Sequence, residues 1–143
     1  MAFSFLTQEL AIDLGTANTV IFMKDKIVVD EPSIIAIDQN TKKPIAVGKQ
    51  ARLMHEKTNP NIRTIRPMKD GVIADFQAAE LMIRGMIKMI NNKRSSLFTP
   101  NLRIVIAIPS GSTEVETRAV RDAAEHSGGR DVNIILEPMA AAI

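Results

Sequence analysis

Residues 9–23, E-L-A-I-D-L-G-T-A-N-T-V-I-F-M, carry the pattern that decides the fold. Apolar residues alternate through 9–13, and 19–23 is rich in β-branched residues, so both segments are typical of β-strands. Between them, residues 15–18 include Gly and Asn, which favour turns. The stretch therefore predicts a β-hairpin near the start of the chain.

The following part of the chain predicts a meander of short strands. Lys24-Asp25 makes a tight polar break, and Glu31-Pro32 is expected to interrupt the strand pattern. Residues 62–75 are irregular and predict no regular element. The elements expected in this part are strands at 27–29, 33–37 and 45–47 and a short helix near 50–55.

The second half of the chain predicts alternating strands and helices. Residues 76–90 recur at helical spacing, with one face made of Ala79, Ile83, Met86, Ile87 and Ile90. Residues 103–108 and 132–136 are apolar runs typical of buried parallel strands. Between them, Ser112 or Thr113 is expected to cap a helix that Gly128-Gly129 ends. The pattern predicts an α/β fold with a mixed sheet and helices against it.

Composition excludes several classes of function. The 143 residues are 45% hydrophobic and 24% charged, which is ordinary for a globular protein. Aromatic residues are only 3% and the net charge is +2, so nucleic acid is not an expected partner. The lack of Cys removes disulfides and thiolate catalysis, and no segment predicts a membrane span or signal peptide. We therefore expect a cytoplasmic protein.

The predicted hairpin turn and its flanks, residues 13–19, are the first candidate for chemistry. Gly15 tolerates unusual backbone angles, and successive amides of such a turn can point at one oxyanion. Thr16 and Asn18 would add side-chain donors. Asp13, just before the turn, would hold a divalent metal beside the phosphates. An ordinary hairpin also favours such residues, so this motif alone does not establish a phosphate site.

Glu137, at the junction of the last expected strand and an Ala-rich segment, is the second candidate. Ligands of open α/β sheets gather at the carboxyl ends of strands, where Glu137 should stand. The plainer alternative is an acid favoured at a helix start by the helix dipole. Residues 109–112 also follow a strand, but we expect them only to lead into a helix.

The order of these motifs resembles the superfamily of actin, heat-shock chaperone ATPases and sugar kinases. A phosphate turn lies between the first two strands, and a later strand ends in Glu137-Pro138 before Ala-rich helix. Residues 66–75, R-P-M-K-D-G-V-I-A-D, and Asn18-Thr19 after Gly-Thr-Ala look like the MreB family of bacterial actins. The similarity runs over essentially the whole chain.

This resemblance implies an actin-like (ribonuclease H-like) fold, with a mixed five-stranded sheet, flanking helices and a small inserted subdomain. It implies an apolar tail at 1–8, subdomain IA from 9–31 and 71–143, and subdomain IB at 32–70. The family's second phosphate loop, adenosine pocket and remaining subdomains would lie beyond Ile143. We therefore expect the chain to be incomplete at its C-terminus.

The resemblance also implies ATP and Mg²⁺ as cofactors. In this family Asp13 would serve the metal, and Glu137 matches the residue that orients or deprotonates the attacking water. The residues that would serve the phosphates are Gly15, Thr16, Ala17, Asn18 and Thr19. The family commonly has a second Glu where this chain has Leu136, so a role shared by two acids is not carried over. We expect ATP hydrolysis from the complete protein but not from this part alone, because half a cleft stabilises the transition state from one side only.

Membrane contact is a further prediction. Apolar residues begin the chain and also interrupt a polar stretch next to Lys93 and Arg94, and MreB-like proteins attach to membranes through such elements. The alternatives are a frayed terminus and an ordinary loop. The expected contact residues are Phe3, Phe5, Leu6, Leu97 and Phe98.

The predicted function is that of an ATP-dependent, actin-like filament protein at the inner face of the cell membrane, which organises cell-shape and wall synthesis. Its expected partners are further copies of itself, an anionic membrane surface, and cell-shape and wall-synthesis proteins. Two alternatives stay open: a chaperone-type or sugar-kinase ATPase domain, and a truncated interaction module that associates without nucleotide. The sequence beyond Ile143 would decide between them.

Overall fold

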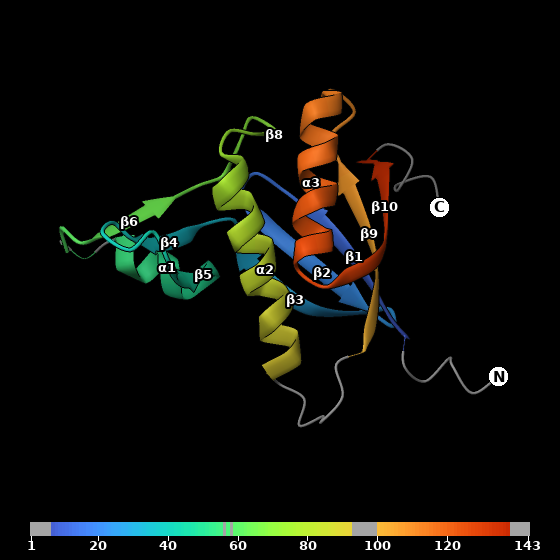
Figure 1. The fold of residues 1–143 in the computed structure, drawn as a ribbon, viewed down its shortest axis with the longest axis horizontal. Coiled ribbons are helices and arrows are strands. Elements are labelled where there is room, and N and C mark those ends of the chain that lie inside the picture. Colours follow the sequence, from blue (N-terminus) through green and yellow to red (C-terminus); the bar gives the residue numbers. More distant parts are fainter. Residues whose placement is uncertain (1–6, 56, 58, 93–99, 138–143) are drawn as a thin grey trace.

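The computed structural model describes residues 7–55, 57, 59–92 and 100–137. These residues form a five-stranded sheet with two helices on one face and a smaller three-stranded sheet to one side (Figure 1). A two-stranded ladder follows the small sheet in the chain. Within these described ranges, no helix is both long and apolar enough to cross a bilayer.

The large sheet is mixed, as the sequence predicted. Its strand order is β10-β9-β1-β2-β3. Strand β9 is parallel to both β1 and β10, whereas β2 is antiparallel to both β1 and β3. The strands are β1 (Thr7–Leu14), β2 (Asn18–Met23), β3 (Lys26–Pro32), β9 (Asn101–Ile108) and β10 (Gly129–Leu136).

The main core lies between this sheet and helices α2 (Phe76–Asn92) and α3 (Glu114–His126). Alternate residues of each strand face it, so that Leu10, Ile12 and Leu14 of β1 are all at most 2% exposed. Helix α2 buries the predicted apolar stripe, in which Ile83, Met86 and Ile87 are at most 2% exposed, and it also buries Met82, which the prediction left out. Because burial of each large apolar side chain stabilises by about 1.5–3 kcal/mol, this stripe holds α2 on the sheet.

Helix α3 begins with a capping box. Thr113 Oγ1 accepts a hydrogen bond from the Glu116 amide at 3.2 Å, and Glu116 Oε2 accepts one from the Thr113 amide at 2.6 Å. Two amides that the helix itself cannot pair are thereby satisfied. Thr113, rather than Ser112, is therefore the N-cap.

The small sheet contributes to two cores at once. Its order is β5-β4-β6, with strands β4 (Ile35–Asp38), β5 (Pro44–Val47) and β6 (Ile62–Ile65), and helix α1 (Gly48–His55) packs beside it. Ile35 and Ile37 join the main core, whereas Ala36 packs in a second cluster with Ala51 of α1. The side chains of β4 alternate between the two clusters, so this strand ties the small sheet to the large one.

Two details of the sequence prediction are wrong. Strand β3 continues through Glu31-Pro32. It is an edge strand that ends at Pro32, and proline, which has no amide hydrogen to donate, is tolerated at such a position. The segment 62–75, predicted to be irregular, contains β6 and the ladder of β7 (Met68–Lys69) with β8 (Val72–Ile73). Asp70 and Gly71 join this ladder with φ of 52° and 77°, the positive values that two-residue hairpin loops require.

Candidate functional site

Three parallel strands bring the predicted acidic residues to one edge of the large sheet. Asp13 on β1 lies opposite Ala107 on β9, which in turn lies opposite Ile135 on β10. Glu137 directly follows the last residue of β10 and lines the same cavity as Asp13 and Ile135. Asp13 and Ile135 are two strand spacings apart, or roughly 10 Å, which leaves room for a ligand between the acids.

A cavity of about 550 Å³ opens at this edge. Asp13, Gly15 and Glu137 all line it, together with apolar side chains of the sheet face that α2 and α3 do not cover. The full lining is Ala11, Ile12, Asp13, Gly15, Phe22, Val105, Ala107, Ile135 and Glu137. The structure thus brings together the two acids and the start of the turn that the sequence singled out.

The turn between β1 and β2 has its carbonyl groups held by the protein. Gly15 O accepts from Ser33 Oγ at 2.7 Å, Ala17 O accepts from the Ser33 amide at 2.8 Å, and Asn18 O accepts from the Gly15 amide at 3.1 Å. Within the described residues, the amides of Thr16 and Ala17 donate to no protein acceptor. Adjacent free amides in a turn form an anion-binding concavity.

Gly15 is required at its position by a close approach. A Cβ there would lie 2.5 Å from Asn18 O, closer than real Cβ contacts come. The glycine therefore allows the turn to close tightly at the end of β1, next to Asp13.

The remaining residues of the predicted phosphate turn differ in their surroundings. Thr16, Ala17 and Asn18 are exposed, and Thr16 Oγ1 accepts a hydrogen bond from the Gly71 amide at 2.9 Å. Thr19 is only 1% exposed, and its hydroxyl lies 2.9 Å from Ser33 Oγ instead of lining the cavity. Ser33 and Gly71 are contacts that the sequence analysis missed, because no local pattern pairs them with a turn so far away in the chain.

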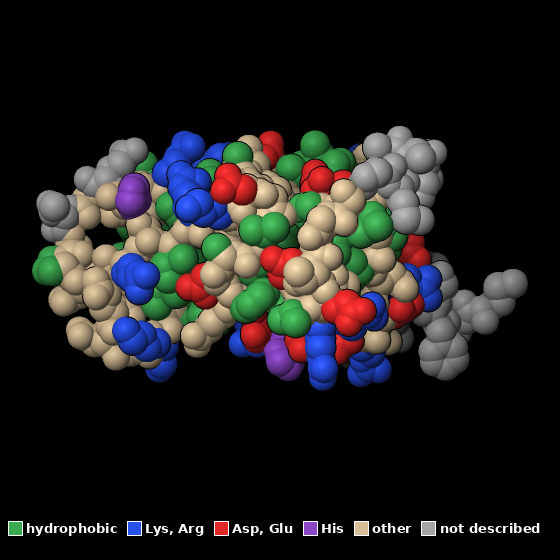
Figure 2. Space-filling view, turned by 90° about the horizontal axis from the view of Figure 1, so that it is seen from above, with side chains coloured by type: hydrophobic (Ala, Val, Ile, Leu, Met, Phe, Trp, Pro, Cys, Tyr) green, Lys and Arg blue, Asp and Glu red, His purple; other side chains and the backbone are tan. Residues whose placement is uncertain are grey.

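The charge of the cavity suits a cation that accompanies an anionic ligand. Among the described residues, its lining has two carboxylates and no Lys or Arg, and nowhere do three or more His, Asp or Glu gather as a metal site. Figure 2, viewed from the side of the strand ends, shows acidic and hydrophobic side chains together in its middle, with Lys and Arg toward the small sheet and along the lower edge of the view. Mg²⁺ commonly binds through one or two carboxylates plus substrate phosphates, so Asp13 and the free amides fit a magnesium–phosphate group.

An ion-pair network stands at the other end of the same sheet face. Arg103 on β9 bonds Glu9 on β1 at 3.0 Å and Asp131 on β10 at 2.9 Å. These bonds, above all that to Asp131, raise the pKa of Arg103. All three side chains are at least half exposed, so the network stabilises the sheet only weakly and does not resemble a reactive site.

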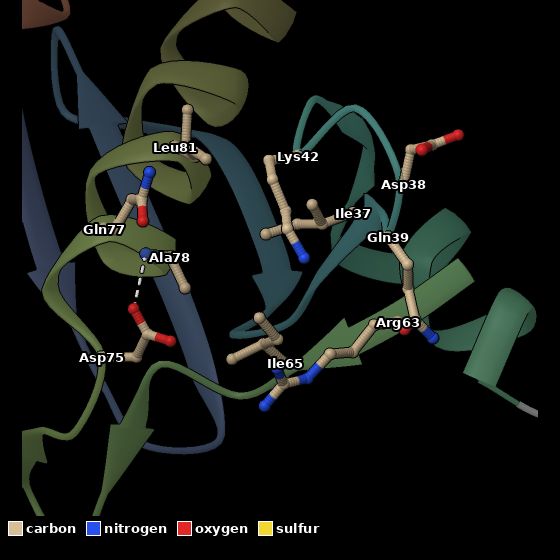
Figure 3. A pocket seen from close by; sticks show the side chains of 10 residues that line it. All are labelled: Ile37, Asp38, Gln39, Lys42, Arg63, Ile65, Asp75, Gln77, Ala78 and Leu81. Carbon is tan, nitrogen blue, oxygen red and sulfur yellow. Dashed lines mark hydrogen bonds between the residues drawn. The ribbon is translucent and has the colours of Figure 1, made fainter. Parts of the chain in front are cut away.

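A second, smaller cavity of about 280 Å³ lies between the small sheet and α2 (Figure 3). Lys42 and Arg63 extend into it opposite Asp75 and Gln77. Its acids have local structural partners: Asp75 Oδ1 accepts from the Ala78 amide at 2.9 Å, and amides of Thr41 and Asn40 lower the pKa of Asp38. In this cavity, unlike the first one, both acids are therefore held by nearby backbone amides.

The predicted membrane-contact residues lie outside the described part of the chain. They are Phe3, Phe5, Leu6, Leu97 and Phe98. Their predicted role is therefore untested by this structure.

Comparison with known proteins gives consistent matches over nearly the whole chain. The family model described as MreB/Mbl protein matches residues 7–143. The cell shape-determining protein MreB of Escherichia coli K12 is 47% identical over 142 residues, covering 96% of this chain and 40% of that protein. The cell shape-determining protein Mbl of Bacillus subtilis is 47% identical over 137 residues, covering 95% and 40%.

Solved structures agree with these sequence matches. MreB5 of Spiroplasma citri bound to ADP has a TM-score of 0.77 and 34% identity, covering 95% of this chain and 40% of that one. The same protein bound to AMPPNP has a TM-score of 0.76 and 34% identity, covering 96% and 42%. The chain therefore spans about 40% of the length of these relatives. Because the family model matches nearly every residue and the fold agrees, this chain belongs to the MreB/Mbl protein family.

Proposed function

We propose that this chain forms one wall of the nucleotide cleft of an MreB-type, actin-like filament protein that organises cell shape. The observation that carries the proposal is the cavity lined by Asp13, Gly15 and Glu137, where Gly15 begins a turn in which the amides of Thr16 and Ala17 donate to no acceptor among the described residues. The S. citri relative is bound to ADP and to AMPPNP in its solved structures, which supports a nucleotide as the ligand.

In this proposal the turn binds the phosphates of ATP. The amides of Thr16 and Ala17 donate to phosphate oxygens, and the exposed side chains of Thr16 and Asn18 add polar contacts. Asp13 holds Mg²⁺ directly or through water, and the bound metal supplies positive charge that offsets the phosphate charge. The apolar sheet face beneath the acids limits the access of water to one side of the ligand.

Glu137 is the proposed general base. It stands across the cavity from Asp13, where it would accept a proton from the water that attacks the terminal phosphate. Leu136 occupies the preceding position and is 38% exposed, so Glu137 acts without a neighbouring acid at that position.

The isolated chain is proposed to bind nucleotide weakly and to hydrolyse it negligibly. Phosphoryl transfer needs groups positioned on several sides of the phosphate, and this chain spans about 40% of the length of its relatives. We propose that subdomain IA comprises residues 9–31 and 71–143, subdomain IB residues 32–70, and an apolar tail residues 1–8. ATP hydrolysis would then belong to the complete protein.

The nucleotide proposal is tested by completing the cleft. In a chimera, this chain is followed by the part of the E. coli relative that lies beyond the matched region. Calorimetric titration with Mg·ADP should show binding by the chimera and much weaker binding by the chain alone. Asp13→Asn should raise Kd about tenfold or more, equivalent to about 1.4 kcal/mol. Asp25→Asn, in the exposed turn after β2, is the matched control and should change nothing. A folded chimera that binds no nucleotide would reject the proposal.

Self-assembly and membrane attachment complete the proposed function. We propose that copies of the complete protein form filaments at the cytoplasmic face of an anionic membrane, where they contact cell-shape and wall-synthesis proteins. The membrane contacts would be Phe3, Phe5, Leu6, Leu97 and Phe98, and nucleic acid is not a proposed partner. Burying Leu97 and Phe98 would yield roughly 3–6 kcal/mol before ordering costs, so single molecules bind weakly and filaments firmly.

Liposome co-sedimentation tests the membrane contact. Chimera carrying both Leu97→Ser and Phe98→Ser should pellet less with anionic vesicles than the parent. Leu53→Ser removes an exposed apolar side chain from α1 and serves as the control. Equal pelleting of the double variant and the parent would remove these two residues from the interaction.

A further inference from the structure

Two buried hydroxyl groups stand directly behind the candidate phosphate turn. Thr19 and Ser33, at 1% and 0% exposure, are the polar side chains that the described part of the chain buries fully. Their oxygen atoms lie 2.9 Å apart. Burial of a hydroxyl group is unfavourable unless it is hydrogen-bonded, so this pair needs a partner that accepts its remaining proton.

That partner is the turn itself. The single hydroxyl proton of Ser33 goes to Gly15 O at 2.7 Å, so the hydroxyl of Thr19 must donate to Ser33 Oγ. The result is a directed chain of hydrogen bonds from Thr19 through Ser33 to the carbonyl of Gly15. Such chains polarise each member and strengthen one another in a buried setting.

Ser33 also holds the turn through its backbone. Its amide donates to Ala17 O at 2.8 Å. One residue therefore fixes the carbonyls on both sides of Thr16, and each carbonyl belongs to a peptide plane whose orientation also sets the following amide. The Gly15 carbonyl shares its peptide plane with the amide of Thr16, and the Ala17 carbonyl shares its plane with the amide of Asn18. In the chain, these two amides lie on either side of the free amide of Ala17.

We infer that Thr19 and Ser33 are positioning residues, which orient the amides of the turn toward phosphate before any ligand arrives. This inference rests on the proposed nucleotide function and changes the part expected of Thr19, from a phosphate contact to a buried support. A site whose donors are already oriented avoids an ordering cost on binding, so the pair acts on phosphate affinity and not on overall stability alone.

The test separates positioning from stability. Thr19→Val removes the hydroxyl at nearly constant shape, and Thr19→Ser restores it. Ile21→Val, in the same strand, trims a fully buried side chain that has no polar link to the turn. In the chimera, Thr19→Val should weaken ATP and ADP binding about fivefold to tenfold, the worth of one hydrogen bond, while leaving adenosine binding unchanged.

Two comparisons decide the result in the chimera. Thr19→Ser should recover most of the affinity for ATP and ADP, and Ile21→Val should leave that affinity unaltered even where it lowers the urea midpoint. Equal loss of ATP and adenosine binding, or a Thr19→Val protein that binds ATP like the parent, would overturn the inference.

A second measurement does not depend on nucleotide at all. In the 143-residue chain, hydrogen exchange of the Gly15 amide, which donates to Asn18 O across the turn, should be faster in Ser33→Ala and Thr19→Val than in Ile21→Val and the parent. Unchanged exchange at the turn would refute the positioning role even if nucleotide binds. Faster exchange in a chimera without nucleotide binding would instead reject the proposed function and keep the structural role of the pair.

Discussion

Replacement of Gly15 by Ala sets two opposing effects against each other. Gly15 is not among the residues with positive φ, so Ala would restrict the unfolded chain and stabilise the protein by about 0.4–1 kcal/mol if space allowed. Space does not allow it, because the new Cβ would lie 2.5 Å from Asn18 O, where ordinary contacts begin at 3.4 Å. The turn must therefore open until the new Cβ and Asn18 O are nearly at an ordinary contact distance.

The contact is with backbone, so it cannot be relieved by a side-chain rotation. Opening the turn also weakens the 3.1 Å bond from the Gly15 amide to Asn18 O. Overpacking of this kind typically costs about 1–3 kcal/mol, against an entropic gain of about 0.4–1 kcal/mol, so we expect a net destabilisation of up to about 2.5 kcal/mol. The amides of Thr16 and Ala17 would shift as well, and a misplacement near 1 Å can lower catalytic rates about 10²-fold.

Urea unfolding of the 143-residue chain, followed by circular dichroism, measures the stability effect. Gly111→Ala is the matched control, since a Cβ there meets nothing within 4 Å, and it should be neutral or slightly stabilising. If Gly15→Ala unfolds at the same urea concentration as Gly111→Ala, the turn is not closed as tightly as described and the reasoning is refuted.

Three further outcomes are expected. In the completed chimera, Glu137→Gln should slow single-turnover ATP hydrolysis about 10² to 10⁴-fold, the usual contribution of a general base, and an unchanged rate would exclude Glu137 from that role. Thr113→Ala breaks the capping box and should lower the free energy of urea unfolding by about 1 kcal/mol, whereas exposed Ser110→Ala should not. The amides of Thr41 and Asn40 hold the pKa of Asp38 below 3.8, so its contribution to stability is present above that pH and is lost as the pH falls through the lower, folded-state pKa. The urea midpoint of the parent should therefore fall more between about pH 6 and pH 3 than that of Asp38→Asn, and parallel declines would contradict this cause.

Local patterns predicted most of the elements but not all of their limits. The helical spacing that ends at Ile90 predicted α2, because a stripe of apolar residues can be buried only on one side of a helix. Short strands were harder: β7 and β8 have two residues each, too few for alternation to be visible. The Asp70-Gly71 pair was a usable hairpin signal, since both residues favour positive φ, but the irregular residues around it concealed it.

The individual residues of the candidate site were predictable from the sequence, but the strand pairing that brings them together was not. Asp13, Gly15 and Glu137 were recognisable from residue type and from their position at strand ends. The register that places Ala107 beside Asp13 and Ile135 was not, because parallel pairing joins segments far apart in the chain.

The sequence by itself determined the local elements of this protein, namely a tight turn at Gly15, an amphipathic α2 and a capped α3, because turn geometry, helical period and caps depend on neighbouring residues. Only the tertiary structure decided that β9 lies between β1 and β10, which brings Asp13 and Glu137 to one cavity. It also decided that Ser33, expected only at a strand start, lies behind the turn, where its hydroxyl donates to Gly15 O and its amide donates to Ala17 O. Long-range contacts such as these are set by which apolar faces pack together and exclude water. That packing depends on residues from the whole chain, so no local pattern reveals it.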